Sequence, residues 1–274
     1  MSEPAMRQIT ADVTRCCAAV YSSELATLLL GDTWHPGGLD LTRRLGQLAG
    51  LTPESHVLDV ASGVGTSAIA IAEEFGCTVT GVDASEQNAA HATERAGESE
   101  VAARIRFVTG DANRLAFPPG SFDVVLCECA LCTFADQAGA VREFARVLRP
   151  GGRVGISDVT RHGPLPPELN TLLSRIACIA GALPVDAYVR MLETAGFMVT
   201  ETEEHGAALR DVVERIRQRI VGAQLLTRLH QLEIPGVDLE QAAALARLAV
   251  SSVRHGRLGY SLLVAQNPNI RSDS

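Results

Sequence analysis

The chain has 274 residues, a formal net charge of −8 and seven cysteines. This length suits one α/β domain with additions, and the acidic balance argues against a nucleic-acid substrate, because proteins that bind phosphate backbones need a basic surface. No segment approaches the roughly 18 uninterrupted apolar residues of a membrane span, and the polar start does not resemble a signal peptide. We therefore expect a cytoplasmic protein with reduced cysteines and with neither nucleic-acid nor membrane partners.

The first 50 residues contain patterns typical of helices. Apolar positions recur at helical spacing over residues 9–30, and Gly31 is a natural stop for that helix. A loop at 34–38 separates it from a second predicted helix, 39–49. These features predict an N-terminal helical cap, 1–50, on a main domain that covers 51–274.

The main domain alternates short apolar runs with helical segments. The predicted strands are 57–60, 79–82, 105–108, 124–127, 154–158, 198–202 and 260–264. Such alternation is typical of a parallel sheet with helices on both faces. Before the last strand lies a predicted helical insertion, 207–255. Its first part is amphipathic, and 239–253 is apolar on nearly all sides, which indicates burial or a homodimer contact.

A glycine-rich turn follows the first predicted strand. Gly63 and Gly65 would let the main chain approach a ligand closely. Asp83 ends the next strand about 20 residues later, where an acid can bind ribose hydroxyls. A dinucleotide-binding oxidoreductase usually has all three glycines of G-x-G-x-x-G, whereas here Ala61 precedes the pair and Ser67 and Ala68 follow it.

Two more landmarks follow in the chain. Gly110-Asp111-Ala112 comes after the strand at 105–108, and Arg149-Pro150-Gly151-Gly152 precedes the next apolar run. Together with the glycine turn and Asp83, they resemble the class I S-adenosylmethionine-dependent methyltransferases. The resemblance implies a doubly wound, mostly parallel, Rossmann-like α/β sheet in a single folding unit, with S-adenosylmethionine as cofactor.

The same resemblance implies a set of cofactor-binding residues. An acid at the end of the second strand meets the ribose, the landmark after the third strand meets the adenine, and the loop before the second helix closes over the methionine end. The predicted set is Trp34, His35, Gly37, Asp59, Ala61, Gly63, Gly65, Asp83, Ala84, Asp111, Ala112 and Glu128. The alternatives are Asp83 or Ser85 as a helix cap, Asp111 as a turn residue, and Trp34, His35 and Gly37 as residues that pack against the N-terminal helices.

Cysteines are the second unusual feature. Cys129 follows the fourth predicted strand, beside the expected methyl group, and Cys178 lies in a segment after the fifth. The segment around Cys178 resembles the arsenite methyltransferases, which hold trivalent arsenic through cysteine thiolates. The resemblance implies Cys129 and Cys178 as catalytic thiols, with Cys16 or Cys17 as a third. Soft centres such as arsenic prefer sulfur ligands.

Other interpretations remain open at this point. Free cysteines are often simply buried, and Cys127-x-Cys129-x-x-Cys132 suggests zinc but lacks a second ligand pair, so no metal is predicted. A second hypothesis is methyl transfer to a small organic metabolite, with His35, Glu128 or Tyr188 as base or orienting group. A third is a cofactor-binding protein without catalysis.

Overall fold

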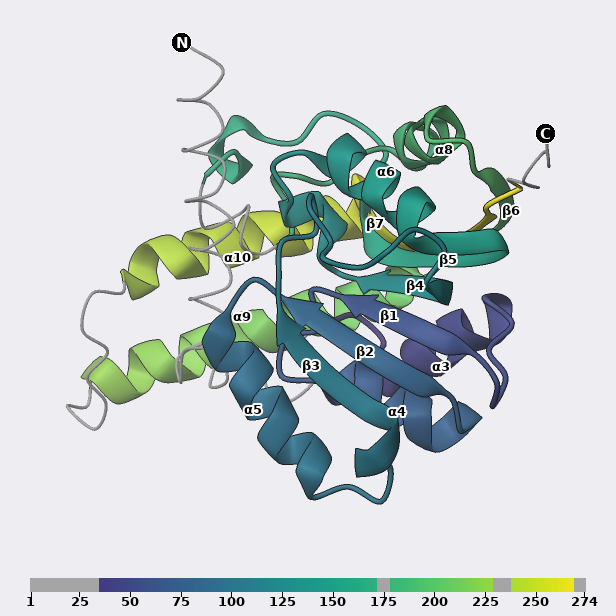
Figure 1. The fold of residues 1–274 in the computed structure, drawn as a ribbon. Helices are drawn as coiled ribbons and strands as arrows, with labels where there is room; N and C mark the ends of the chain where they lie inside the picture. The colour runs from purple at the N-terminus through teal and green to yellow at the C-terminus, as the bar shows by residue number, and fades with distance from the viewer. Residues whose placement is uncertain (1–34, 172–177, 229–237, 269–274) are drawn as a thin grey trace, which may run out of the picture.

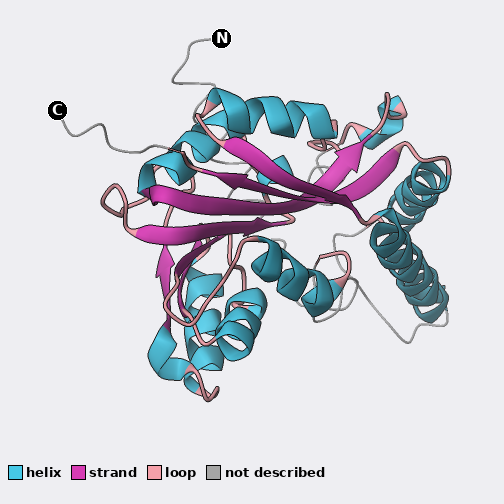
Figure 2. Cartoon of the chain, turned by 90° about the vertical axis from the view of Figure 1, so that its right-hand side faces the viewer, coloured by secondary structure: helices cyan, strands magenta, loops and turns pink. Residues whose placement is uncertain are grey.

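The computed structural model describes residues 35–171, 178–228 and 238–268, drawn in colour in Figure 1. The predicted helix at 9–30 lies outside the described residues, as do Cys16, Cys17 and Trp34. A seven-stranded sheet forms the centre of the molecule, and helices cover both of its faces (Figure 2). No helix among the described residues has the length and apolar character that a membrane crossing requires.

The sheet is mixed, with the strand order β3-β2-β1-β4-β5-β7-β6. The strands are β1 (His56–Val60), β2 (Thr78–Asp83), β3 (Ile105–Thr109), β4 (Phe122–Glu128), β5 (Leu148–Arg161), β6 (Met198–Glu204) and β7 (Leu258–Gln266). Each overlaps a predicted apolar run, and β5 extends beyond the predicted 154–158 at both ends. The strands from β1 to β5 pair in parallel, as predicted. The last strand, β7, inserts between β5 and β6 and runs antiparallel to both.

Two apolar cores lie on opposite faces of the sheet. The helices are α3 (Gly38–Leu48), α4 (Thr66–Phe75), α5 (Glu86–Gly97), α6 (Gln137–Val147), α8 (Val185–Thr194), α9 (Gly206–Arg228) and α10 (Leu239–Arg254), with short 3-10 turns η1 (Ala102–Arg104), η2 (Leu131–Thr133) and η3 (Pro167–Leu169). Leu45 of α3 and Ile71 of α4 belong to one core. Phe144 of α6 and Leu192 of α8 belong to the other. The helices therefore shield both faces of the sheet from solvent.

The predicted helical insertion consists of α9 and α10, which lie side by side beyond the sheet (Figure 1). In α9, Leu209, Val213 and Ile220 are buried at helical spacing, which confirms the amphipathic pattern. In α10 Ala243 and Val250 are buried, but much of the helix is only half-buried. A homodimer contact through these helices stays a prediction.

Candidate active site

A pocket lies at the carboxyl ends of β1, β2 and β4. This is where the strand order reverses, between β1 and β4, and such switch points are where open α/β sheets bind ligands. The predicted residues that line it are His35, Asp59, Ala61, Gly63, Asp83, Ala84, Asp111, Ala112, Glu128 and Cys129. Gly37 and Gly65 are not among the lining residues. Ser62, Asn88, Thr133 and Phe134 line the pocket although the sequence did not single them out.

The two glycines of the turn are needed for different structural reasons. Gly63 has φ +53°, and a Cβ atom built there would meet no heavy atom within 4 Å, so this position is open toward the pocket. A Cβ atom on Gly65, with φ +80°, would lie 2.6 Å from the Phe107 ring and 3.0 Å from Ala92. Gly63 thus leaves space for a ligand, whereas Gly65 lets α4 begin close against its neighbours.

Asp83 ties the glycine turn to the end of β2. Its buried carboxylate accepts hydrogen bonds from the backbone N–H groups of Gly63 (2.8 Å) and Ser85 (2.9 Å) and from the side-chain amide of Asn88 (3.2 Å). The cap of α5 is Ser85, whose Oγ accepts from the Asn88 N–H. The helix-cap alternative therefore belongs to Ser85, and Asp83 shapes the pocket.

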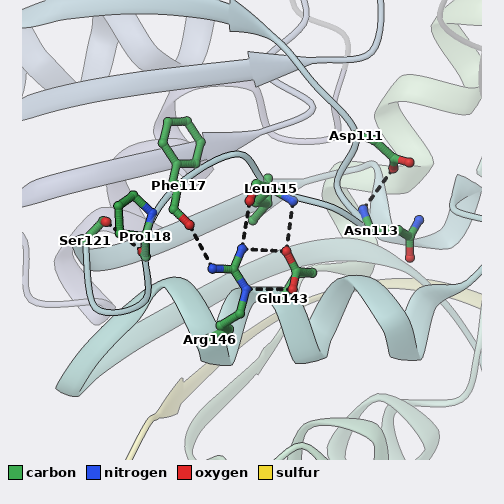
Figure 3. A network of polar contacts seen from close by, with 8 residues as sticks. All are labelled: Asp111, Asn113, Leu115, Phe117, Pro118, Ser121, Glu143 and Arg146. Atoms are coloured by element: carbon green, nitrogen blue, oxygen red, sulfur yellow. Dashed lines mark hydrogen bonds and ion pairs between the residues drawn. The ribbon is translucent and has the colours of Figure 1, made fainter.

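The loop after β3 is held from below by an ion pair on α6. Arg146 donates to the carbonyl oxygens of Leu115 (2.7 Å) and Phe117 (2.8 Å) and to both oxygens of Glu143 (2.7 Å each) (Figure 3). Glu143 in turn accepts from the Leu115 N–H, and Arg146 lowers its pKa. Because this loop includes Asp111, the pair positions one wall of the pocket. No pattern in the sequence indicated this ion pair.

Asp111 itself turns the chain at the pocket wall. Its Oδ1 accepts a hydrogen bond from the Asn113 N–H at 2.9 Å, and both residues line the pocket. The turn role and the predicted position beside a ligand are therefore compatible, since a short polar side chain can serve both.

Four buried polar atoms around the pocket have no hydrogen-bond partner among the described residues. They are Asp59 Oδ2, Ser62 Oγ, Asn88 Oδ1 and Glu128 Oε1. A buried polar group without a partner costs roughly 1–3 kcal/mol. A ligand with an ammonium group, ribose hydroxyls and an adenine amine would supply these missing partners. The residues present therefore fit S-adenosylmethionine.

The charge of the pocket also distinguishes between ligands. Its described lining includes Asp59, Asp83, Asp111 and Glu128 but neither lysine nor arginine. Burial, with further contributions from Glu128 and Asp83, raises the pKa of Asp59 well above its ordinary value. Such a site favours a cationic ligand and disfavours the pyrophosphate of a dinucleotide. The oxidoreductase alternative does not fit.

A hydrogen-bond network fixes Glu128 at the pocket wall. Its Oε2 accepts from Thr42 Oγ1 (3.2 Å) and Ser157 Oγ (3.5 Å), and the Tyr260 hydroxyl donates to Ser157 (2.8 Å). Thr42 also lies 3.3 Å from His35 Nε2. With Oε2 engaged on this side, Oε1 remains available to a ligand. Among these residues, sequence reasoning identified only Glu128 and His35.

The two predicted thiols meet at the edge of this pocket. Cys129 Sγ lies 3.6 Å from Cys178 Sγ, and the Cys178 thiol donates to the Cys129 carbonyl at 3.1 Å. The contact with Cys178 and burial raise the pKa of Cys129. Asp158, in the last part of β5, brings a carboxylate oxygen within 4.8 Å of both sulfurs. Asp158 was not predicted as a site residue.

The zinc-like cysteine spacing does not form a ligand set among the described residues. Cys127 and Cys132 are buried in opposite cores, and neither is part of the three-residue ligand group around Cys129. Cys132 is nevertheless close to that group, because burial and its contact with Cys178 raise its pKa. Tyr188, which was predicted as a possible base or orienting group for an organic substrate, is fully buried and does not line the pocket. Its hydroxyl donates to the Val159 carbonyl at 3.4 Å.

Backbone strain is concentrated at the same place. Three non-glycine residues in the described part of the chain have positive φ angles: Ala61 (61°), Cys129 (49°) and Cys178 (61°). All three lie at the pocket or at the thiol pair beside it. A left-handed backbone costs an L-residue about 1–2 kcal/mol, and such strain is typical of functional sites.

Comparisons with known proteins agree with this geometry. Residues 58–156 match a protein family described as "Methyltransferase domain". The chain is 30% identical over 263 residues to 27-O-demethylrifamycin SV methyltransferase of Amycolatopsis mediterranei, an alignment that covers 90% of this chain and 94% of that protein.

Two further similar proteins are matched over a smaller part of their own length. Arsenite methyltransferase of Halobacterium salinarum is 30% identical over 193 residues, 69% of this chain and 49% of that protein. The structure of Haemonchus contortus phosphoethanolamine N-methyltransferase 2 with S-adenosylhomocysteine superposes with a TM-score of 0.72 at 23% identity, over 89% of this chain and 56% of that one. This likeness confirms the Rossmann-like fold.

Proposed function

Because this chain belongs to the class I S-adenosylmethionine-dependent methyltransferases, we propose that it methylates a trivalent arsenical held by Cys129 and Cys178. The observation that carries the proposal is the pair of thiol sulfurs, 3.6 Å apart, at the edge of the cofactor pocket. A separation of this size suits two sulfurs bound to one arsenic atom. The similarity to an arsenite methyltransferase supports the same substrate class.

The cofactor supplies an electrophilic methyl group on a sulfonium sulfur. In our proposal Asp59 and Glu128 bind its ammonium group through their unpartnered oxygens, while Asp83 and Asp111 face the ribose and the adenine. The thiols of Cys129 and Cys178 replace two oxygen ligands of the arsenical and release water. They would thereby hold the arsenic lone pair toward the methyl group. The new As–C bond would form as the S–C bond breaks, so that neutral S-adenosylhomocysteine leaves and the arsenic becomes pentavalent. Positioning of this kind is worth several kcal/mol, up to roughly 7–11. No general base is needed, because a lone pair is the nucleophile.

A product assay tests the proposal directly. Reduced protein, methyl-labelled S-adenosylmethionine and either arsenite or phenylarsine oxide should yield a methylated arsenical by mass spectrometry. Cys129→Ser and Cys178→Ser should each abolish that product. Cys77→Ser is the matched control, since Cys77 is buried beside β2 and away from the pocket. Full activity in both active-site variants would show that the thiol site is wrong.

A second candidate is transfer to an oxygen, nitrogen or carbon atom of a small organic metabolite. The observation in its favour is the length of the sequence match. The chain spans 94% of 27-O-demethylrifamycin SV methyltransferase but about half of the arsenite methyltransferase. In that case His35 or Glu128, which both line the pocket, would orient or deprotonate the acceptor. The same labelled cofactor with a metabolite extract, and no product with arsenicals, would favour this alternative.

A further inference from the structure

Three potential metal ligands converge beside the cofactor pocket. Cys129 directly follows β4, Asp158 lies in the last part of β5, and Cys178 lies in the segment before α8. Their two sulfurs and one carboxylate oxygen all lie within 4.8 Å of one another. The carboxylate is fully buried, as is nearly all of Cys178. No neighbouring pair of residues in the chain could have indicated this cluster.

The spacing of these atoms is close to that of a tetrahedral site. With zinc–sulfur bonds of about 2.3 Å and zinc–oxygen bonds of about 2.1 Å, tetrahedral angles place two sulfurs about 3.8 Å apart and a sulfur and an oxygen about 3.6 Å apart. Cys129 and Cys178 are 3.6 Å apart, so they already stand at the required separation. The carboxylate oxygen of Asp158 lies within 4.8 Å of both sulfurs, which is at most about 1.2 Å farther than this geometry requires.

The surroundings hold Asp158 in place. Its Oδ1 accepts from the Val159 N–H at 2.8 Å and its Oδ2 from the Cys132 N–H at 2.7 Å. No arginine or histidine of the described residues forms an ion pair with it. Buried carboxylates are normally paired with a cation or bound to a metal. Backbone hydrogen bonds to a ligating carboxylate are the kind of support that metal sites have.

From this cluster we infer a binding site for one thiophilic divalent cation, Zn²⁺ or Cd²⁺, at Cys129, Cys178 and Asp158. Two thiols bind the ion as thiolates and release two protons to the buffer, so no oxidant or reductant takes part. Three protein ligands leave a fourth position open, and Cys129 lies on the pocket wall. The ion therefore occupies the acceptor position and inhibits methyl transfer. This inference rests on the thiol pair of the proposed function.

Ligand chemistry limits which ions fit. Thiolates select soft or borderline metals such as zinc and its heavier relatives, whereas Mg²⁺ and Ca²⁺ require sets of oxygen ligands. The arsenical and the divalent ion also differ in what they need from the site. Two thiols suffice for a monosubstituted arsenical such as phenylarsine oxide, but the divalent ion also uses Asp158. That difference separates the two proposals experimentally.

The test is a titration of reduced full-length protein with Cd²⁺, followed by the ultraviolet charge-transfer band of cadmium thiolates. We expect one equivalent to bind to the wild-type protein and to Cys77→Ser, and Mg²⁺ to have no effect. Cys129→Ser and Cys178→Ser should each lose the band or bind at least tenfold more weakly. An unchanged band in both variants would overturn the site.

Asp158→Asn distinguishes the metal site from the arsenical site. It should weaken Cd²⁺ binding about tenfold or more but leave the binding of phenylarsine oxide unchanged. If Asp158→Asn still melts cooperatively but loses both Cd²⁺ and phenylarsine oxide binding, the proposed role of Asp158 is wrong. If Asp158→Asn does not fold, the titrations of Cys129→Ser and Cys178→Ser decide whether the metal site exists. Phenylarsine oxide binding without Cd²⁺ binding would refute the metal site alone. Cd²⁺ binding without arsenical binding would refute only the proposed substrate.

Discussion

Alanine substitution at the two glycines of the turn should separate protein stability from cofactor binding. Gly65→Ala should lose more unfolding free energy, and Gly63→Ala should lose more cofactor affinity. Both have positive φ angles, +53° at Gly63 and +80° at Gly65, and each alanine variant should lose about 1–2 kcal/mol of unfolding free energy for that reason. Gly65→Ala also forces a methyl group to within 2.6 Å of the Phe107 ring. Overpacking of this kind costs about 1–3 kcal/mol more.

Cofactor affinity should show the reverse order, with the larger loss in Gly63→Ala. The new methyl group in Gly63→Ala meets no protein atom within 4 Å, so it projects into space that the ligand would fill. A clash worth about 1–3 kcal/mol there weakens S-adenosylmethionine binding by roughly ten- to a hundredfold. In Gly65→Ala the pocket keeps its shape apart from the local shift at Phe107, and binding should change much less.

Thermal unfolding with and without S-adenosylmethionine, together with calorimetry, measures both quantities. At about 2–4 °C per kcal/mol for a chain of this size, Gly63→Ala should melt about 5 °C below the wild type and Gly65→Ala about 10 °C below it. The cofactor should raise the melting temperature of Gly65→Ala but hardly that of Gly63→Ala. Wild-type affinity in Gly63→Ala, or equal melting temperatures for the two variants, would refute the reasoning.

Three more predictions concern the surroundings of the pocket. Burial raises the pKa of Asp59 above its ordinary value of 3.8, so the folded protein retains a proton that the unfolded chain loses. The unfolding free energy should therefore fall as pH rises above that value, and urea titrations of Asp59→Asn should show a flatter profile. Arg146→Ala should weaken cofactor binding about tenfold by releasing the loop, whereas Arg149→Ala, which breaks an ion pair at the opposite end of β4, should leave calorimetric affinity unchanged. Cys178→Gly should unfold about 1 kcal/mol less readily than Cys178→Ala in denaturant, because its left-handed backbone penalises alanine but not glycine; equal stability would argue against strain.

The parallel part of the fold could be predicted because each strand carries its own signal. In β1, β2 and β4 nearly every residue is buried, and such strands are continuous apolar runs between helices. The direction of β7 had no such signal. An apolar run has the same pattern in either direction, and α9 and α10 separate β7 from β6, so its place between β5 and β6 depends on tertiary packing alone.

Site residues at the ends of parallel strands could likewise be predicted from the sequence, whereas their distant partners could not. Asp59, Asp83 and Glu128 end parallel strands, and such ends meet at one edge of a sheet. The partners of Glu128 are another matter, because Thr42 lies 86 residues away in the chain and Ser157 and Tyr260 are 103 residues apart. No local pattern could connect them. The cysteine spacing around Cys129 did not indicate Asp158, which comes from another strand and completes the cluster with Cys178.

The strained backbone at the two thiols bears on what the site is for. If Cys129 and Cys178 were only small apolar residues, glycine or an unstrained turn would cost less than two left-handed cysteines, each at about 1–2 kcal/mol. Glycine fills that conformation at ten other described positions. A site that needs two sulfur atoms has no such substitute, because glycine provides none. In the proposed function, the strain at Cys129 and Cys178 is retained because both thiols are needed, a requirement that the arsenical and the divalent cation would share.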